Sequence, residues 1–594
     1  MVKKYKATIG ILSFSILALA LLAAGCVGNK AAPTLEPTGL PTALPTATQD
    51  LPKVTAVMLD RTEVPLFEQV EMRLALEAQY TNPYDARQVS LDGVFTGPDG
   101  KTMTVPGYWD GEGSWRMSFT SSQEGEWSYQ LVVRDGRGES SPSKGTFTVT
   151  PSDLHGWLQV GNSVNPDYSG HYLVYRDGTP FYGVGHCDAL NILVGGYTLN
   201  QGVSLFNDMK KAGENIVVWW PLYSNSPIAT SYQDYTVSAL KIIDMVVSDA
   251  QKKGIFLVFT IWDHPELRDS THAWGTGNWN RNGFSQLGDI NSFFTSAEAW
   301  AWQENFYRYI IARWGSSTAI GLWQTVSEIN GTNAYEQTDP WHKKVNDYFV
   351  ANDPYRHPTT ASMSGDVDWP TGHQVMDAPQ VHLYDFSNGS LKIDAVHAAE
   401  VLAHWTELMW NQADKPNWVG EFGSPGNTYY PELFHNSIWA ALASGAAMTP
   451  AKWAGGGSWP EMMPEMYADQ GRLAQFVADI PLAKLNPSPL QVSSSDPQVR
   501  GWGMAGKNGG LLWVQDFSLE EKATIDEVRA GQSVRKGVQI DIQGLFGGMF
   551  TITPYDTWQG SYLTALAVTC SEGQPCTIAL PDFKADMAFK IERK

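Results

Sequence analysis

The stretch Gly321-Leu-Trp-Gln-Thr-Val-Ser-Glu-Ile-Asn330 decides how the fold of this chain is interpreted. Most of it is apolar or β-favouring, as expected of a strand that is buried on both faces. The apolar run stops at a carboxylate, Glu328, where the polar loop Asn330-Gly-Thr-Asn333 begins. A second stretch, Asn417-Trp-Val-Gly-Glu-Phe-Gly423, has the same design and carries Glu421. Two buried strands that each end in a glutamate predict a pair of carboxylates at one rim of the fold.

The composition indicates a globular protein of several domains. The chain has 594 residues, which is more than one hydrophobic core holds. It contains 43% hydrophobic and 17% charged residues, which argues against disorder. The net charge of −21 argues against a nucleic-acid partner, which requires a basic surface, and it disfavours polyanionic substrates. The chain is rich in aromatic residues, with Trp 24, Tyr 24 and Phe 23. Most of these rings fill cores, and the others can stack on sugar faces.

The N-terminus has the pattern of an export signal. Lysines precede the apolar run Ile9–Ala24, which is too short for a comfortable membrane span. Its end, Leu22-Ala-Ala-Gly-Cys26, resembles a bacterial lipobox, and that resemblance implies cleavage before Cys26 and acylation of its thiol. We expect a signal peptide over residues 1–25, an extended Pro/Thr-rich tether over residues 26–51, and a lipid anchor at the bacterial cell surface. An ordinary secretory signal with an incidental cysteine is the alternative.

The other cysteines have separate interpretations. Cys570 and Cys576 bracket a turn-like loop in an exported protein, which predicts a local disulfide. Cys187 is then left single. It could be a nucleophile, but its apolar surroundings favour a buried, inert thiol.

Three folded regions are predicted after the tether. Residues 52–150 contain short alternating runs separated by turn signals, which predict an immunoglobulin-like β-sandwich. Residues 151–484 alternate apolar strands with amphipathic helices, which predicts a (β/α)8 TIM barrel with catalysis at the strand C-termini. Residues 485–594 return to strands and predict a C-terminal β-sandwich. The eight expected barrel strands are Phe181–His186, Asn215–Trp220, Ile255–Trp262, Ile320–Ser327, Thr359–Met363, Gln380–Tyr384, Trp418–Phe422 and Ala446–Trp453.

Two regions resemble modules of sugar-cleaving proteins. The segments Asn82-Pro-Tyr-Asp85, Gly107-Tyr-Trp-Asp-Gly111 and Gly125-Glu-Trp127 resemble the module called domain of unknown function 5060, which commonly precedes sugar-cleaving barrels. The segments Tyr175-Arg-Asp-Gly-Thr-Pro-Phe181 and Gly183-Val-Gly-His-Cys-Asp188 resemble domain of unknown function 4038, to which apiosidase-like enzymes belong.

The two glutamates end the fourth and seventh expected strands, an arrangement that resembles clan A retaining glycoside hydrolases, family 5 cellulase-like enzymes above all. The resemblance implies that Glu328 is the acid/base and Glu421 the nucleophile of a double displacement. Retention requires carboxyl groups roughly 5–5.5 Å apart. It also requires that Glu328 begins protonated, with a raised pKa, while Glu421 is ionised.

Further residues at the expected strand ends are implied to contact the sugar or to orient the glutamates. They are His186, Asp188, Trp219, Trp262, His264, Ser327, His382, Tyr384 and Trp453. Tyr384 would hydrogen-bond the nucleophile, and Trp453 would lie under the bound sugar. Ser327 departs from the clan pattern, in which an asparagine at this position bonds the sugar 2-hydroxyl. Each of these side chains could instead serve packing.

The sequence therefore predicts a glycosidase that acts on O-glycosyl bonds of a poly- or oligosaccharide without a metal or another cofactor. Two inserts, Thr271–Asn282 and Gly455–Pro464, are expected to shape the sugar subsites. One alternative is a non-catalytic, glycan-binding surface lipoprotein, which the Ser327 departure favours. Another is a metal-dependent barrel hydrolase. It would need a His-x-His pair in the first strand, and His186 has no histidine two residues away.

Overall fold

The computed structural model describes residues 50–188, 192, 197–198, 202–222, 226–269, 277–333, 337–384, 395–423, 431–454, 461–517 and 533–594. By its internal contacts the chain divides into two units, Met1–Gln49 and Asp50–Lys594. The expected signal peptide, nearly all of the expected tether and Cys26 lie outside the described residues. Among the helices of the described part, none combines the length and the apolar character that a membrane span requires.

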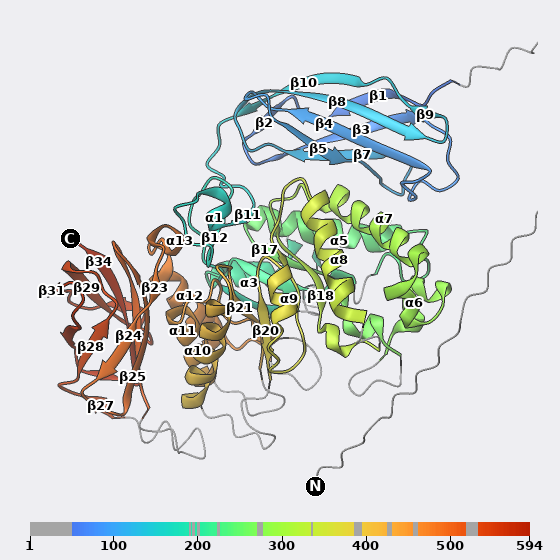
Figure 1. Ribbon diagram of the computed structural model, residues 1–594. Coiled ribbons are helices and arrows are strands. Elements are labelled where there is room, and N and C mark those ends of the chain that lie inside the picture. The colour runs from blue at the N-terminus through green and yellow to red at the C-terminus, as the bar shows by residue number, and fades with distance from the viewer. Residues whose placement is uncertain are drawn as a thin grey trace, which may run out of the picture. The chain divides into compact units, whose positions relative to one another are not determined.

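Residues 53–150 form two β-sheets around one hydrophobic core (Figure 1). The first sheet has the order β1-β3-β7-β6, and its strands are β1 (Lys53–Leu59), β3 (Gln69–Glu77), β7 (Trp115–Thr120) and β6 (Tyr108–Trp109). The second has the order β2-β10-β8-β4-β5, with β9 paired to β8, and its strands are β2 (Glu63–Pro65), β10 (Ser143–Thr150), β8 (Gly125–Asp135), β4 (Val89–Thr96), β5 (Thr102–Pro106) and β9 (Gly138–Glu139). All pairs are antiparallel except β2–β10. Burial alternates along β3, as in a sheet with one face on a core.

The middle of the chain is built from parallel strands with helices between them. Six strands pair in the order β19-β18-β17-β16-β13-β22, and they are β19 (Thr359–Thr360), β18 (Ile320–Ser327), β17 (Phe256–Asp263), β16 (Ile216–Trp219), β13 (Gly185–Asp188) and β22 (Trp453–Ala454). Two more, β20 (Gln380–Leu383) and β21 (Trp418–Phe422), form a separate parallel pair. A parallel bridge joins Phe422 to Lys452, just before β22. Every residue of β17 and β18 is buried, as expected of strands covered on both faces.

The helices of this region follow the strands in chain order. The longer ones are α3 (Ser204–Lys211), α5 (Val237–Lys253), α7 (Ala297–Trp314), α8 (Thr338–Asn352), α10 (Ala395–Gln412), α11 (Pro431–Ala443) and α12 (Pro464–Val477). Helix α5 shows why they form. Leu240, Ile243 and Val247 are buried on one face of it, and Gly254 ends it with a φ of 69°, a left-handed conformation that glycine adopts without steric cost.

The observed strands agree with the expected ones most closely where a buried run ends in a polar residue. Strands β18 and β21 have the expected bounds. The last expected strand, Ala446–Trp453, is wrong over most of its length, because only Trp453–Ala454 is a strand and Met448 makes an isolated bridge to Gly183. Pro450 interrupts this segment, and proline has no N–H to donate to a β-ladder.

Residues 488–593 form a further set of β-sheets around their own core. The largest has the order β23-β25-β26-β34-β29-β30, with β31 paired to β29, and its strands are β23 (Ser488–Pro489), β25 (Val499–Gly506), β26 (Gly509–Asp516), β34 (Asp586–Arg593), β29 (Gly548–Asp556), β30 (Ser561–Tyr562) and β31 (Leu566–Cys570). The smaller sheets contain β24 (Gln491–Ser494), β28 (Gln539–Gln543) and β32 (Cys576–Ala579), and the pair β27 (Val534–Arg535) and β33 (Phe583–Lys584). A disulfide joins Cys570 of β31 to Cys576 of β32 and so links two of these sheets.

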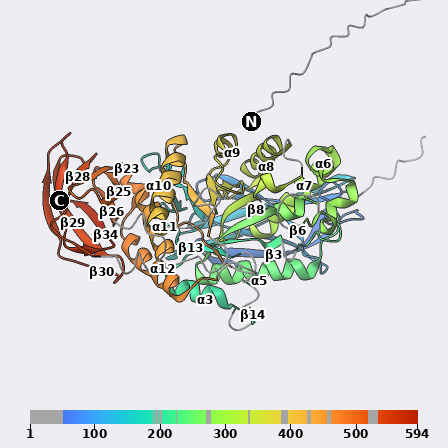
Figure 2. The same cartoon turned by 90° about the horizontal axis from the view of Figure 1, so that it is seen from below.

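Helices connect the central strands to the sheets on either side. Helix α11 packs against β25 and β26, and α10 and α12 flank it (Figures 1 and 2). On the other side, Asn305 of α7 donates to the carbonyl of Tyr84 at 2.5 Å and accepts the N–H of Ala86 at 2.8 Å. The guanidinium of Arg87 lies 4.4 Å from the ring centre of Trp302 on α7. The N-terminal sheets are thus joined to the helix that precedes β18.

Candidate active site

Glu328 follows the last residue of β18 and has an unusual backbone. Its φ and ψ are 54° and 53°, in the left-handed region that is costly for a residue with a side chain. Its side chain is buried, with 7% of the residue exposed. The turn reverses the chain directly at the strand end and leads into a short 3₁₀ helix, η4 (Ile329–Gly331). A non-glycine residue held in this conformation at a strand end is typical of functional sites.

The segment that follows β19 holds this turn in place. The N–H of Glu328 donates to Ser362 Oγ at 3.0 Å, and the N–H of Ile329 donates to the Ser362 carbonyl at 3.0 Å. Asn330 Nδ2 donates to the Ser364 carbonyl at 3.0 Å and its Oδ1 accepts the Ser364 N–H at 2.7 Å. These four hydrogen bonds stabilise the left-handed residue. Sequence reasoning identified Asn330 only as the start of a polar loop, and it did not identify either serine.

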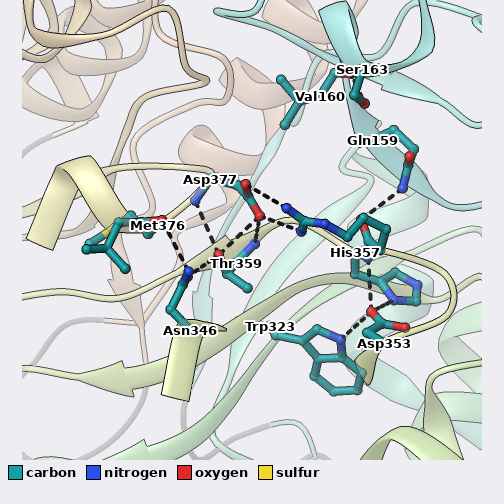
Figure 3. Close-up of polar contacts among 12 residues, drawn as sticks. Gln159, Val160, Ser163, Trp323, Asn346, Asp353, His357, Thr359, Met376 and Asp377 are labelled. Atoms are coloured by element: carbon teal, nitrogen blue, oxygen red, sulfur yellow. Dashed lines mark hydrogen bonds and ion pairs between the residues drawn. The ribbon is translucent and has the colours of Figure 1, made fainter. Parts of the chain in front are cut away.

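A buried polar cluster fixes the start of β19, at the opposite end of the strand (Figure 3). Asp353 accepts hydrogen bonds from Trp323 Nε1 at 3.0 Å and from the N–H of His357 at 3.0 Å. Thr359 Oγ1 donates to Asn346 Oδ1 at 2.6 Å. Because Thr359 is bonded to α8 and Asp353 to β18, the short strand that leads to Ser362 has a defined position.

Glu421 lies within β21 and has regular strand geometry. Its neighbour across the sheet is His382 of β20. Tyr384 Oη donates to Glu421 Oε2 at 2.7 Å, and Ser327 Oγ lies 3.5 Å from Oε1. Burial and the nearby Glu421 raise the pKa of Tyr384, so its hydroxyl remains a donor. Glu421 is thus an almost fully buried carboxyl group, with 3% of the residue exposed, that is held by two neutral hydroxyls.

One imidazole connects the two glutamates. His382 Nδ1 lies 3.0 Å from Glu328 Oε1 and 3.2 Å from Glu421 Oε2. One ligand atom from each of the three residues lies within 4.8 Å of the others. The carboxyl groups of β18 and β21 therefore share one buried site, although they come from separate sheets of the described strand pairing.

His264 adds a second imidazole on the far side of Glu328. Its Nδ1 lies 3.4 Å from Glu328 Oε2 and 3.0 Å from Oδ1 of the adjacent Asp263. Burial lowers the pKa of His264, but the two carboxylates outweigh it and raise the pKa above its ordinary value. Glu328 therefore lies between two histidines. Sequence reasoning had selected His264 but not Asp263.

The pKa shifts of the two glutamates run opposite to the expected order. Burial raises the pKa of Glu328, but the hydrogen bond from His382 and the charges of His264 and His382 outweigh it, so the net shift is downward. Burial raises the pKa of Glu421, and the charge of Glu328 raises it further. The reason is that His264 and His382 both lower the pKa of Glu328, whereas the charge of Glu328 raises the pKa of Glu421 beyond what its hydroxyl donors offset. Of the two carboxyl groups, Glu421 therefore has the higher affinity for a proton.

The tryptophans that were expected to contact the sugar differ in their surroundings. Trp453 lies beside Trp220, with ring centres 5.2 Å apart, and Trp453 is partly exposed. Trp219 packs instead against Phe259 in a hydrophobic core. Trp262 is also a core residue, and its Nε1 donates to Tyr307 Oη of α7 at 2.8 Å. The expected sugar contacts of Trp219 and Trp262 are therefore corrected to packing roles, because both side chains face the helices.

The first strand requires a similar correction. His186 Nδ1 pairs with Glu214 Oε2 at 2.9 Å, and its ring lies against Tyr467 of α12. Asp188 Oδ2 lies 3.9 Å from His186 Nε2. These two side chains are thus between the sheet and α12, away from the glutamates. The residue between them, Cys187, is the one whose thiol lies near Glu421, and burial together with that carboxylate raises the pKa of the thiol well above its ordinary value. A protonated, buried thiol agrees with an inert Cys187.

The arrangement supports two kinds of chemistry. Two close carboxyl groups with different proton affinities can serve as an acid and a nucleophile. The same carboxylates and His382 also form a group whose ligand atoms could surround a divalent cation. Parts of both expected subsite inserts, residues 271–276 and 455–460, lie outside the described residues.

Comparison with protein families matches one region of the chain. The family model described as Domain of unknown function (DUF5060) matches residues 63–134, which confirms the resemblance noted for the N-terminal region. No curated protein matches the sequence.

Comparison with solved structures returns glycoside hydrolases. A proposed glycoside hydrolase from Bacteroides vulgatus ATCC 8482 has a TM-score of 0.59 at 18% identity, over 90% of this chain and 100% of that one. A family 5 glycoside hydrolase from the same organism has a TM-score of 0.47 at 12% identity, over 74% and 94% of the chains. An endo-1,4-beta-mannanase from Rhizomucor miehei has a TM-score of 0.39 at 14% identity, over 51% and 97%. At these identities, the likeness to the first structure establishes a shared α/β fold.

Proposed function

We propose that this chain is a retaining glycoside hydrolase that cleaves O-glycosidic bonds of a poly- or oligosaccharide. The observation that carries the proposal is the meeting of two buried carboxyl groups, Glu328 and Glu421, at one imidazole nitrogen of His382. Their nearest ligand atoms lie within 4.8 Å. Carboxyl groups this close support a retaining mechanism, in which the two groups are roughly 5–5.5 Å apart.

The proposal includes a (β/α)8 barrel of the clan A type. Six parallel strands and the β20–β21 pair give the required eight, and each is followed by helix or loop before the next. Two hydrogen bonds support closure between β21 and β22, from the N–H of Phe422 to Ala451 O at 3.0 Å and from the N–H of Ala451 to Val419 O at 2.9 Å. On this view residues 151–484 are the catalytic barrel.

The flanking regions and the N-terminus complete the proposal. The two sheets of residues 53–150 support an immunoglobulin-like sandwich, and the sheets after residue 485 support a C-terminal sandwich. The resemblance of Leu22–Cys26 to a lipobox supports a lipid anchor on Cys26 and a location at the bacterial cell envelope. The proposal that the barrel is apiosidase-like rests on the resemblance of residues 175–188 to domain of unknown function 4038.

In the first proposed step, a carboxylate oxygen of Glu421 attacks the anomeric carbon. The bond from that carbon to the glycosidic oxygen breaks, and this oxygen takes a proton from Glu328 and leaves as an alcohol. Because Glu421 has the higher affinity for the proton that the pair carries, this proton must move to Glu328 before Glu421 attacks. His382 Nδ1 contacts both carboxyl groups, so it can pass its proton to Glu328 and accept that of Glu421.

In the second step, Glu328 is the base. Its carboxylate takes a proton from a water molecule, and the water oxygen attacks the anomeric carbon and displaces Glu421. Tyr384, whose hydroxyl lies 2.7 Å from Glu421 Oε2, stabilises the carboxylate as it is released. Two displacements at one carbon restore its original configuration.

A glycan panel tests the proposal. The wild-type chain, Glu421→Gln and Glu328→Gln are incubated with plant and microbial polysaccharides, with and without chelator, and the released sugars are quantified. We expect sugar release to fall at least about 100-fold in both variants, and to be equal for the wild type with and without chelator. Wild-type turnover in both variants would refute the pair, and loss of activity in chelator would favour a cation held by Glu328, His382 and Glu421. Binding without release of sugar would favour the non-catalytic alternative.

A further inference from the structure

A hollow of about 450 Å³ lies where α11 meets the C-terminal sheets. Its lining includes Trp558 and Gln559 from the turn between β29 and β30, Leu563 directly after β30, Lys584 from β33, and Glu432 from the first turn of α11. The volume is within the usual range of small-molecule sites, roughly 300–1,000 Å³. The hollow shares no residue with the glutamate pair.

Trp558 forms a rigid wall of this hollow. One face of its ring stacks on the imidazole of His435, with ring centres 4.0 Å apart and planes inclined by 17°. Its Nε1 donates to Asp586 Oδ2 at 2.7 Å, and its backbone N–H donates to Asp556 Oδ1 at 3.0 Å. The residue is nevertheless partly exposed. Because the indole N–H already has an acceptor, the ring can offer a ligand only its apolar carbon atoms.

The support beneath the ring is itself fixed. His435 Nδ1 lies 2.9 Å from Asp469 Oδ2, and its Nε2 lies 3.1 Å from Asp586 Oδ1. Burial lowers the pKa of His435, but the two aspartates outweigh it and raise the pKa to about 9. A charged imidazole clamped between two carboxylates under the indole leaves the ring few alternative orientations. A ligand that stacks on it would lose little conformational entropy of the protein.

The rim of the hollow supplies hydrogen-bonding groups around the apolar ring. Gln559 and Lys584 are exposed, so they offer an amide donor and acceptor and an ammonium donor. An apolar ring in one hollow with such groups suits a pyranose, which has an apolar C–H face and a ring of hydroxyls. We propose that the hollow is a second glycan-binding site, in which a neutral sugar unit stacks on Trp558 and bonds to Gln559 and Lys584.

The position of the hollow indicates which glycan it would bind. Helix α11 follows β21, and in a parallel strand–helix unit the helix begins on the side where the strand ends. Glu432 therefore lies on the same side of the strands as Glu421. A site there can hold a distant part of the chain whose bond is cleaved at the glutamates. The choice of a glycan as ligand rests on the proposed function.

Affinity gel electrophoresis tests this inference in the Glu421→Gln background, which removes cleavage. The probes are galactomannan, xylan, xyloglucan and mixed-linkage β-glucan. The variants are Trp558→Phe and the pair Gln559→Ala with Lys584→Ala, whose exposed side chains contribute little to folding. Glu465→Ala, exposed on α12, is the matched control. We expect at least one polysaccharide to retard the parent, and the site variants to weaken this binding about three- to tenfold, with unchanged circular dichroism.

Equal retardation of the parent and the site variants on every polysaccharide, or no retardation of the parent at all, would overturn the second site. The wild-type chain in the glycan panel separates this result from failure of the proposed function. If it releases no sugar while retardation still depends on Trp558, the second glycan-binding site is supported and the hydrolase proposal fails. If it releases sugar without Trp558-dependent retardation, the hydrolase proposal stands and the second site fails.

Discussion

Glu328 and Glu421 look alike in the sequence, but their surroundings differ in almost every physical respect. Glu328 is in a left-handed turn that Ser362 and Ser364 hold by hydrogen bonds, and its carboxyl group lies between His264 and His382. Glu421 is in regular strand geometry. Its hydroxyl donors are Tyr384 at 2.7 Å and Ser327 at 3.5 Å. The difference teaches that neighbouring side chains, and not the strands that carry them, give two carboxyl groups different pKa values.

The largest expected effect is that of removing Glu421. Because it forms the covalent bond to the sugar, Glu421→Ala should lower kcat on the order of 10⁴-fold or more. Added azide should restore turnover by attacking the anomeric carbon directly, and it should give a glycosyl azide of inverted configuration, which NMR distinguishes. Glu465→Ala, an exposed glutamate on α12, is the control. An azide product of retained configuration would assign the nucleophile elsewhere.

Removal of Glu328 should have a smaller effect that depends on the leaving group. Loss of a positioned acid costs about 10²–10⁴-fold, so Glu328→Ala should lower kcat/KM by that factor on the natural glycan. An aryl glycoside with a good leaving group needs no protonation, so its first displacement should be nearly unaffected. Pre-steady-state kinetics on both substrates measure the difference. An equal loss on the two substrates would contradict the distinct roles of the two glutamates.

The pH dependence should reflect the opposite pKa shifts of the pair. The active form carries one proton. Because the pKa of Glu421 is raised by burial and by Glu328, that proton should be lost only well above the ordinary glutamate pKa of about 4.3. Because the pKa of Glu328 is lowered, the second proton should bind only below that value. A profile of kcat/KM against pH should therefore be broad. An alkaline limb between pH 4 and 5 would contradict the raised pKa of Glu421.

Tyr384→Phe should affect the Glu421 side of the pair alone. A hydrogen bond to a charged group contributes about 1.5–3 kcal/mol, so its loss should lower kcat about 10- to 100-fold. The same loss removes a contact that lowers the pKa of Glu421 and should move the alkaline limb upward. Ser327→Ala is the comparison, since its hydroxyl is 3.5 Å from Glu421 and its removal should cost less. Equal losses in the two variants would show that the short hydrogen bond has no special role.

The smallest effect should come from Ser362→Ala, which acts on Glu328 only through its position. Loss of the 3.0 Å hydrogen bond to the Glu328 N–H should lower kcat on the natural glycan about three- to tenfold, for roughly 1 kcal/mol. The activated aryl glycoside should be cleaved at the wild-type rate. Ser163→Ala, whose hydroxyl bonds the Val160 carbonyl at 2.7 Å, is the control. A loss on both substrates would indicate general destabilisation.

Much of the fold could be predicted from the sequence, because buried apolar runs that stop at polar residues mark strand ends. The bounds of β18 and β21 followed from this pattern. The pattern does not show on which face of the sheet each side chain lies. Neighbouring residues of a strand lie on opposite faces, so an error of one residue selects the wrong face. Three of the misassigned residues are of this kind. Trp219 was expected where Trp220 meets Trp453, and His186 and Asp188 where Cys187 faces the glutamates.

The conformation and charge of Glu328 were beyond sequence reasoning for a different reason. Its left-handed backbone depends on Ser362, which lies in the segment after β19 and is not marked by any local motif. Its lowered pKa depends on His382 of β20 and on His264, which directly follows β17. Such properties arise from the distances between elements, and these are fixed only by the packed structure.

The anomeric configuration of the first sugar released tests the central claim most directly. It is followed by ¹H NMR from the start of the reaction, on the polysaccharide that the wild-type chain cleaves, before mutarotation obscures it. The close carboxyl pair and the nucleophilic role of Glu421 predict a product with the configuration of the original glycosidic bond. A first product of inverted configuration would contradict both, since it would require a water molecule between Glu328 and Glu421 in a single displacement.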